Sequence, residues 1–100
     1  MKPLRISLSA RTDLADIRAF GTDEWGSAQA SKYTRMIARR LKLLRRWPGA
    51  GAALDEAIEG LRRIQIGSHA IYYFEREEYV LIARILHHRM DYRRHLPEPD

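Results

Sequence analysis

The sequence predicts a small α+β domain in which a helical hairpin packs on one face of an antiparallel sheet, with the element order β-α-α-β-β-β. Apolar residues recur at helical spacing over residues 14–44, and they alternate at strand spacing near the N-terminus and over residues 61–86. A chain of 100 residues, 45% of them hydrophobic, is long enough for one core and too short for two. We therefore expect one domain over residues 1–96 and a frayed tail over residues 97–100.

The first elements are an edge strand and a helix. Residues 4–8 alternate apolar and polar side chains, as in a strand with one buried face. Ser9 is placed to cap the helix that follows. The apolar residues of this helix end at Trp25, directly before Gly26, which stops it.

A second, longer helix is predicted from a cap at Ser27 to Trp47, where Pro48 and a glycine end it. Arg40 lies within the apolar arc of this helix, so we expect its stem to pack and its head to meet a carboxylate or a partner chain. The opposite face is basic, which makes it either a solvated face or an attachment surface for an acidic partner. The cations on this face are Lys32, Arg35, Arg39, Lys42 and Arg46.

The C-terminal half predicts a loop and then a meander of three strands. Residues 48–59 are rich in Gly and Ala, with one helical turn expected over residues 55–58. Strands are expected over residues 61–66, 70–75 and 79–86, joined by a Gly-Ser turn and a charged turn. Alternation directs Ile71, Tyr73, Leu81, Ala83 and Ile85 toward the helices and leaves an open face lined by Arg63, Ala70, Tyr72, Arg84 and His88.

The charge balance and the missing cysteines narrow the function classes. Eighteen Lys and Arg against 13 Asp and Glu give a net charge of +5, which favours nucleic acid, an anionic membrane surface or an acidic protein segment as partner. Without cysteine there is no disulfide, thiolate zinc site or cysteine nucleophile. No apolar run reaches the length of a signal peptide or a membrane span, so we expect a cytoplasmic protein without a membrane partner.

A polar segment follows the most apolar strand. Residues 85–96 hold three of the four histidines, together with three arginines and one aspartate. A polar, titratable segment at a strand end is a common way to build a site. His87 and His88 are adjacent, so on a strand they point to opposite faces and form no metal site. No motif for a cofactor, a phosphate loop or a serine nucleophile is present.

Metal-free ribonuclease chemistry is the enzymatic hypothesis for this segment. It needs a base, a cation and an acid, which His88, Arg84 and Tyr92 could supply. The alternative is that the residues are structural, with Arg84 paired to a glutamate and Arg89 paired to Asp91. Direct DNA binding is disfavoured, because no recognition-helix pattern or aromatic stacking platform accompanies the basic face.

Short motifs occur in a fixed order along the chain. They are Leu8-Ser9 with Ala10, Asp13-Leu14 with Ile17, Trp25-Gly26, Leu44 with Pro48, Arg63 with Gly67-Ser68-His69, and the run from Arg84 to Asp91 followed by Arg94-His95-Leu96. This ordered set, with its Ile-Leu-His-x-Arg-Met-Asp run, resembles the ParE branch of the RelE/ParE toxin superfamily across essentially the whole chain. The resemblance implies the RelE/ParE fold, which has the element order predicted above.

The resemblance also implies the toxin of a type II toxin-antitoxin pair, which inhibits growth when free and is neutralised by a ParD-like antitoxin with an acidic tail. ParE-like toxins act on DNA gyrase and stabilise its cleaved-DNA state, without catalytic residues of their own, whereas RelE-like relatives cut messenger RNA on the ribosome. DNA would be contacted only indirectly, through the antitoxin, and no cofactor is implied.

Two departures from the RelE pattern favour the gyrase branch. RelE-type ribonucleases carry an arginine where this chain has Ala70, and Tyr92 is out of step with their stacking tyrosine. A ribosome-dependent ribonuclease and a binding module that has lost toxicity remain the alternatives.

Two surfaces would carry the function on this resemblance. The target would be engaged by Arg89, Asp91, Arg93, Arg94 and His95, with support from Arg84 and His88, because these polar residues cluster at a strand end. The antitoxin would bind the helical hairpin and its basic face, at Phe20, Trp25, Lys32, Arg35, Met36, Arg39, Arg40 and Lys42.

Overall fold

A computed structural model of the chain describes residues 1–96. The elements follow the predicted order, with one short extra strand and two single-turn 3-10 helices. They are β1 (Leu4–Ile6), α1 (Leu8–Trp25), α2 (Ser27–Arg46), η1 (Pro48–Ala50), β2 (Ala52–Ala53), β3 (Leu61–Ile66), β4 (His69–Glu75), β5 (Val80–His87) and η2 (Tyr92–Arg94). The frayed tail expected over residues 97–100 lies outside the described residues.

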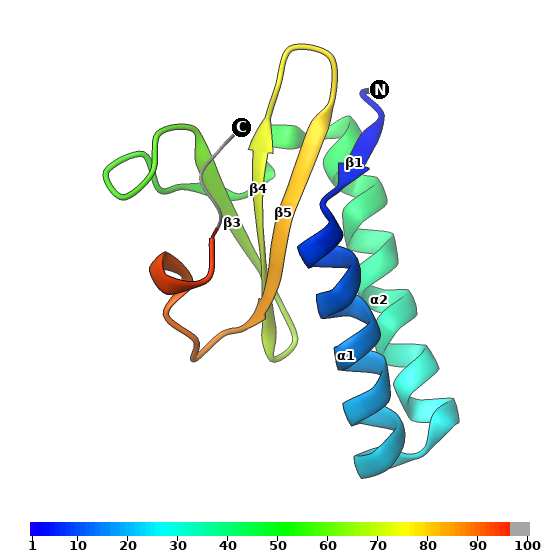
Figure 1. The fold of residues 1–100 in the computed structure, drawn as a ribbon. Helices are drawn as coiled ribbons and strands as arrows, with labels where there is room; N and C mark the ends of the chain where they lie inside the picture. Colours follow the sequence, from blue (N-terminus) through cyan, green and yellow to red (C-terminus); the bar gives the residue numbers. More distant parts are fainter. Residues whose placement is uncertain (97–100) are drawn as a thin grey trace.

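The strands form one sheet in the order β1-β5-β4-β3-β2, and α1 and α2 lie together on one side of it (Figure 1). This arrangement confirms the predicted α+β class, the helical hairpin and the position of β1 at an edge. The sheet is mixed rather than wholly antiparallel, because β1 pairs with β5 in the parallel direction. The direction of pairing depends on the path of the chain through the helical hairpin. The alternation of apolar and polar residues within a strand does not indicate that direction. Neither helix in residues 1–96 is long and apolar enough to cross a membrane.

The cap of the first helix lies two residues earlier than predicted. Ser7, and not Ser9, is the cap, because the Oγ of Ser7 accepts a hydrogen bond of 3.0 Å from the backbone N–H of Ala10. The Ser7 hydroxyl also donates to the carbonyl oxygen of Ala83 on β5, at 2.7 Å, so the start of α1 is tied to the sheet. Leu8 is consequently the first residue of α1, where it is exposed, and not the last residue of β1.

The main core lies between the helices and the sheet. Tyr73 is fully buried there, and its hydroxyl donates to the carbonyl of Pro48 (2.6 Å) and accepts from the N–H of Gly51 (2.8 Å). This pair of bonds fixes the loop after α2 against β4. The other buried members are Ala10, Ile37, Leu41, Leu44, Ile66, Ile71, Val80, Ile82 and Ile85.

A bulge in β5 changes which of its residues face the helices. Tyr72 pairs with Arg84, but the next residue, Tyr73, pairs with Ile82, so Ala83 is an extra residue in β5. The predicted orientation of Leu81 and Ala83 was therefore wrong: both pack in the cluster on the other face of the sheet. The prediction was correct for Ile71, Tyr73 and Ile85.

The second face of the sheet is a smaller core and not the open face that alternation predicted. Tyr72 is 1% exposed there, and the ring of Tyr92 stacks on it with centroids 5.0 Å apart. Leu96 also packs on this cluster, so the segment after β5 folds back over the sheet. The remaining members are Leu61, Ala70, Phe74, Ala83 and Leu86, covered by Leu54, Ile58 and Leu81.

Candidate functional site

A groove of about 470 Å³ runs between α1 and the adjoining ends of β4 and β5. Its walls are largely apolar, and three of its large side chains are exposed to solvent: Phe20 (61%), Trp25 (49%) and Met90 (38%). Large apolar side chains gathered in one exposed groove mark a binding surface. The other lining residues are Asp13, Asp16, Ile17, Ser68, His69, Arg84, Ile85, Leu86 and His87.

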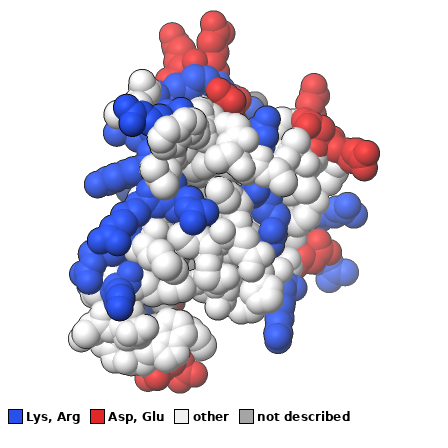
Figure 2. Space-filling model, turned by 180° about the vertical axis from the view of Figure 1, so that it is seen from behind, with Lys and Arg blue, Asp and Glu red and all other residues white. Residues whose placement is uncertain are grey.

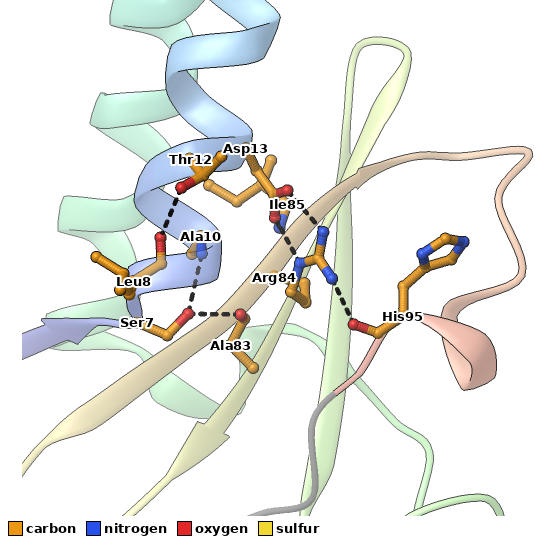
Figure 3. A network of polar contacts seen from close by, with 9 residues as sticks. All are labelled: Ser7, Leu8, Ala10, Thr12, Asp13, Ala83, Arg84, Ile85 and His95. Atoms are coloured by element: carbon orange, nitrogen blue, oxygen red, sulfur yellow. Dashed lines mark hydrogen bonds and ion pairs between the residues drawn. The ribbon is translucent and has the colours of Figure 1, made fainter.

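Asp13 and Arg84 form a clamp at the wall of this groove (Figure 3). The carboxylate of Asp13 accepts from Nε and Nη2 of Arg84, both at 2.8 Å, and from the backbone N–H of Ile85 at 2.9 Å. The Nη1 of Arg84 donates to the carbonyl oxygen of His95. The hydrogen bond to Asp13 raises the pKa of Arg84. Arg84 therefore joins α1 to the C-terminal segment that follows β5 (residues 88–96). Its structural partner is an aspartate in place of the expected glutamate.

Three imidazoles and one phenol lie at the ends of β4 and β5. The hydroxyl of Tyr33 is 2.6 Å from Nδ1 of His69, and it accepts from the N–H of Ser68 at 3.0 Å. The His69 ring lies against His87, with centroids 5.6 Å apart. Burial lowers the pKa of His69, and the nearby His87 and His88 lower it further.

The expectation that His87 and His88 point to opposite faces was wrong. Their rings stack with centroids 4.7 Å apart, because β5 ends at His87 and the chain turns at His88. No group of three His, Asp or Glu side chains in residues 1–96 is arranged to hold a metal ion.

The residues expected to engage the target share the C-terminal segment. Asp91 caps η2 by accepting from the N–H of Arg93 at 3.1 Å, and it forms an exposed ion pair with Arg94 at 3.7 Å. Arg89 is also exposed, whereas His95 is partly buried and its carbonyl oxygen is held by Arg84. The expected pairing of Asp91 with Arg89 is replaced by its pairing with Arg94.

The three residues of the ribonuclease hypothesis have different surroundings. Arg84 lines the groove beside α1, where its guanidinium is held by Asp13. Tyr92 borders a different hollow beside residues 53–57, and its ring covers Tyr72. His88 borders neither of these hollows. The Arg84 guanidinium is thus held by a carboxylate, and the Tyr92 ring by an aromatic stack.

The basic face of α2 is exposed along its length. Figure 2 shows Lys and Arg side chains in a band down the side of the molecule where α2 lies. The helix supplies seven of the 18 Lys and Arg of the chain and none of its Asp or Glu. Successive cations three and four residues apart repel one another, which disfavours the helix by about 0.2–0.5 kcal/mol per pair. The members Lys32, Arg35, Arg39, Lys42 and Arg46 are all exposed.

The residues expected to bind an antitoxin fall into two groups. Phe20 and Trp25 line the groove, whereas Met36 and Arg40 lie along α2 and are not among its lining residues. Asp13 and Ile17 also line the groove and were not predicted as site residues. Asp13 lies in one of the ordered motifs, but no local pattern pairs it with a residue 71 positions away.

The fold is that of the RelE/ParE-type toxins. A solved chromosomal ParDE toxin-antitoxin system from P. aeruginosa superposes with a TM-score of 0.75 at 21% identity, covering 87% of this chain and 96% of that one. The RelBE2 toxin-antitoxin complex from Mycobacterium tuberculosis superposes with a TM-score of 0.67 at 19% identity, covering 86% and 96%.

Sequence similarity then identifies the family. Residues 4–92 match the family described as the ParE toxin of the type II toxin-antitoxin system parDE. Toxin ParE1 of Caulobacter vibrioides is 36% identical over 96 residues, which is 96% of this chain and 99% of that protein. Toxin ParE1 of Mycobacterium tuberculosis is 34% identical over 92 residues, which is 91% and 94%. The chain belongs to the ParE toxin family of type II toxin-antitoxin systems.

Proposed function

We propose that this chain inhibits growth by poisoning DNA gyrase in the cytoplasm and that a ParD-like antitoxin neutralises it. The observation that carries the proposal is the family match over residues 4–92, which reaches through β5 into the C-terminal segment. The exposed cations and apolar surfaces described above are suited to binding two protein partners.

The C-terminal segment is the proposed gyrase-binding surface. Tyr92 stacks on Tyr72 and Arg84 holds the carbonyl of His95, so the segment is fixed at both of these points. Arg93 and Arg94 are exposed on the η2 turn between them. A cationic surface held on a fixed backbone loses little conformational freedom when it binds. Arg89 and Asp91, in the turn before η2, complete the proposed surface together with His95.

The contacts that hold Arg84 support a non-catalytic mechanism. A ribonuclease would need the Arg84 guanidinium to stabilise a phosphorane, but its donors are directed at Asp13 and His95. Recruiting it would require breaking the clamp. The proposed activity is therefore binding that traps the target, without a catalytic residue or cofactor from this chain.

The proposed antitoxin surface combines the groove with the basic face of α2. Phe20 and Trp25 offer apolar anchor sites in the groove, and the α2 cations would attract an acidic tail. The solved relatives of this fold include ParDE and RelBE2 toxin-antitoxin assemblies, which supports an antitoxin as the partner. DNA would be reached through that partner.

A supercoiling assay tests the proposed target. Purified chain is titrated into gyrase, ATP and relaxed plasmid, and both lost supercoiling and trapped linear DNA are scored. We expect inhibition with linear product, and we expect the double variant Arg93→Glu, Arg94→Glu to inhibit much less. The matched control, Arg35→Glu with Arg39→Glu, reverses as many charges on α2 and should inhibit like the unchanged chain.

Two outcomes would contradict the proposal. Folded protein that leaves gyrase unaffected would exclude the target, and cleavage of messenger RNA on translating ribosomes would replace it with the ribonuclease hypothesis. In that case, the variants His88→Ala and Tyr92→Phe should abolish cleavage while the fold stays intact.

A further inference from the structure

A strand covers only part of the edge of β5 that lies next to α1. Within residues 1–96, β1 pairs with residues 80–82, and β5 continues beyond it. Side chains take over along the rest of this edge (Figure 3): the hydroxyl of Ser7 donates to the carbonyl of Ala83 at 2.7 Å, and the carboxylate of Asp13 accepts from the N–H of Ile85 at 2.9 Å. Asp13 therefore takes the place of a strand partner and is held at a fixed position against β5.

Arg84 reaches from this edge to the C-terminal segment. Its Nε and Nη2 donate to the two carboxylate oxygens of Asp13, both at 2.8 Å, and its Nη1 donates to the carbonyl oxygen of His95. A guanidinium is planar, so two parallel bonds to one carboxylate fix the orientation of the whole group. Asp13 therefore sets the direction of Nη1, and with it the place where the carbonyl of His95 is held.

The bond from Arg84 falls at the end of the η2 turn. Within this turn the backbone N–H groups of Arg94 and His95 donate to the carbonyls of Asp91 and Tyr92, at 3.1 and 3.0 Å. A 3-10 turn this short has few hydrogen bonds of its own, so contacts at its two ends decide whether it stays formed.

Two contacts bracket the cations of η2. The ring of Tyr92 is stacked on the sheet at the start of the turn, and Arg84 holds the backbone at its end. Arg93 and Arg94 lie between these two contacts, and both are exposed. The position of these two cations therefore depends on Arg84, although neither of them touches it through the bonds described above.

We infer that Asp13 and Arg84 are positioning residues for the target-binding surface: Asp13 orients the guanidinium, which holds the end of η2 and so places Arg93 and Arg94. The side chains of Arg84 and Asp13 are only 19% and 10% exposed, so a partner protein can reach little of either. This inference rests on the proposed function in one respect, because it takes the C-terminal segment as the surface that binds gyrase.

The variant Arg84→Lys tests the inference in the free chain and with gyrase. Lysine keeps a positive charge beside Asp13, but an ammonium group has no fixed plane through which one partner can orient it toward another. We expect the N–H groups of residues 94–96 to exchange hydrogen with solvent about tenfold faster or more. Inhibition of supercoiling should weaken by about tenfold or more, because ordering even one backbone residue on binding costs about that factor in affinity.

The matched control is Leu44→Ala. Leu44 is fully buried in the main core, so its truncation destabilises the fold and leaves the clamp intact. At a temperature at which circular dichroism shows both variants folded, Leu44→Ala should inhibit gyrase like the unchanged chain. An equal loss of inhibition in Leu44→Ala and Arg84→Lys would overturn the inference, because stability alone would then set the inhibition.

A charge swap separates positioning from pairing. In the double variant Asp13→Arg, Arg84→Asp, opposite charges again face each other between α1 and β5, but a carboxylate has no donor for the carbonyl of His95. The swap should recover stability lost in either single reversal and should still inhibit poorly. Recovery of both stability and inhibition would overturn the inference, and if the swap does not fold, the comparison of Arg84→Lys with Leu44→Ala decides.

The two measurements separate the inference from the proposed function. If the unchanged chain inhibits gyrase and Arg84→Lys inhibits equally well, the inference is wrong while the target stands. If the unchanged chain leaves gyrase unaffected, the proposed target is wrong, and hydrogen exchange in the free chain still decides whether the pair positions the segment. Unchanged exchange at residues 94–96 in Arg84→Lys would then show that it does not.

Discussion

Removing the carboxylate of Asp13 should cost the fold more than any other single polar substitution on α1. The carboxylate accepts three hydrogen bonds, two from Arg84 and one from the N–H of Ile85. The side chains of Arg84 and Asp13 are 19% and 10% exposed, so water replaces little of what is lost. In the variant Asp13→Ala, the guanidinium of Arg84 and the backbone N–H of Ile85 both lose this hydrogen-bond acceptor.

The size of the effect follows from these contacts. Removing one partner of a buried ion pair typically costs about 3–5 kcal/mol, because the remaining charge is left uncompensated. Arg84 keeps its bond to the carbonyl of His95 and some contact with solvent, which places Asp13→Ala near the lower end, at about 3 kcal/mol. For a domain of this size that corresponds to a fall in Tm of roughly 12–24 °C.

Urea unfolding followed by circular dichroism measures this loss. The matched control is Asp16→Ala, which removes an exposed carboxylate one turn further along α1 and should change the free energy of unfolding by less than about 0.5 kcal/mol. A loss below about 1 kcal/mol for Asp13→Ala, with an unchanged m-value, would refute the reasoning that the clamp is a buried, mutually dependent pair.

Three further predictions concern other contacts. Gly51→Ala should lower the free energy of unfolding by about 1–3 kcal/mol, because a Cβ there would lie 2.6 Å from the hydroxyl of Tyr73; no loss in a urea titration would contradict it. Since the pKa of His69 is lowered below 6.5, the unfolded chain binds more protons, so stability should fall as the pH drops below about 6.5. Urea midpoints at about pH 7.5 and pH 5 should differ less in His69→Gln, and an unchanged difference would exclude His69 as the cause. Tyr92→Phe keeps the ring on Tyr72 and should preserve stability and the proposed gyrase inhibition, whereas Tyr92→Ala should lose about 2 kcal/mol of stability in the same urea assay.

The bounds of the main elements followed closely from local sequence. The strands begin and end within one residue of the predicted 61–66, 70–75 and 79–86, because alternating apolar residues and turn residues mark both ends. The buried stripe of α2 was also predicted, since Ala30, Ile37, Leu41 and Leu44 recur at helical spacing. These features depend on residues near one another in the chain.

Features that depend on distant residues were not predicted. The bulge at Ala83 reverses the faces of Leu81 and Ala83, and alternation alone gives no sign of it. The covering of the second face by Tyr92 and Leu96 likewise arises from packing and not from the pattern of either strand. The pairing of Asp13 with Arg84 joins two charges that local spacing cannot connect, which is why the partner of Arg84 was expected to be a glutamate and not Asp13.

The candidate site was predicted in part. The polar C-terminal segment and the basic face of α2 were visible as clusters of charged residues in the sequence. The groove was not, because its walls come from α1 and from the ends of β4 and β5, and only the folded chain brings them together. The helical spacing of apolar residues in α1 could indicate Phe20 and Trp25, two exposed residues of the groove.

The parallel pairing of β1 with β5 determines when the protein can complete its core during synthesis. The ribosome releases β1 first and β5 last among the strands, yet β5 is the neighbour to which β1 is hydrogen-bonded. The helical hairpin emerges early but lacks the strand that closes its core until β5 has been made. A chain that stops before Val80 would leave Val80, Ile82 and Ile85 out of that core, together with Arg84 and the whole C-terminal segment. Nascent chains should therefore lack a closed core and a fixed C-terminal segment until the last strand has been made.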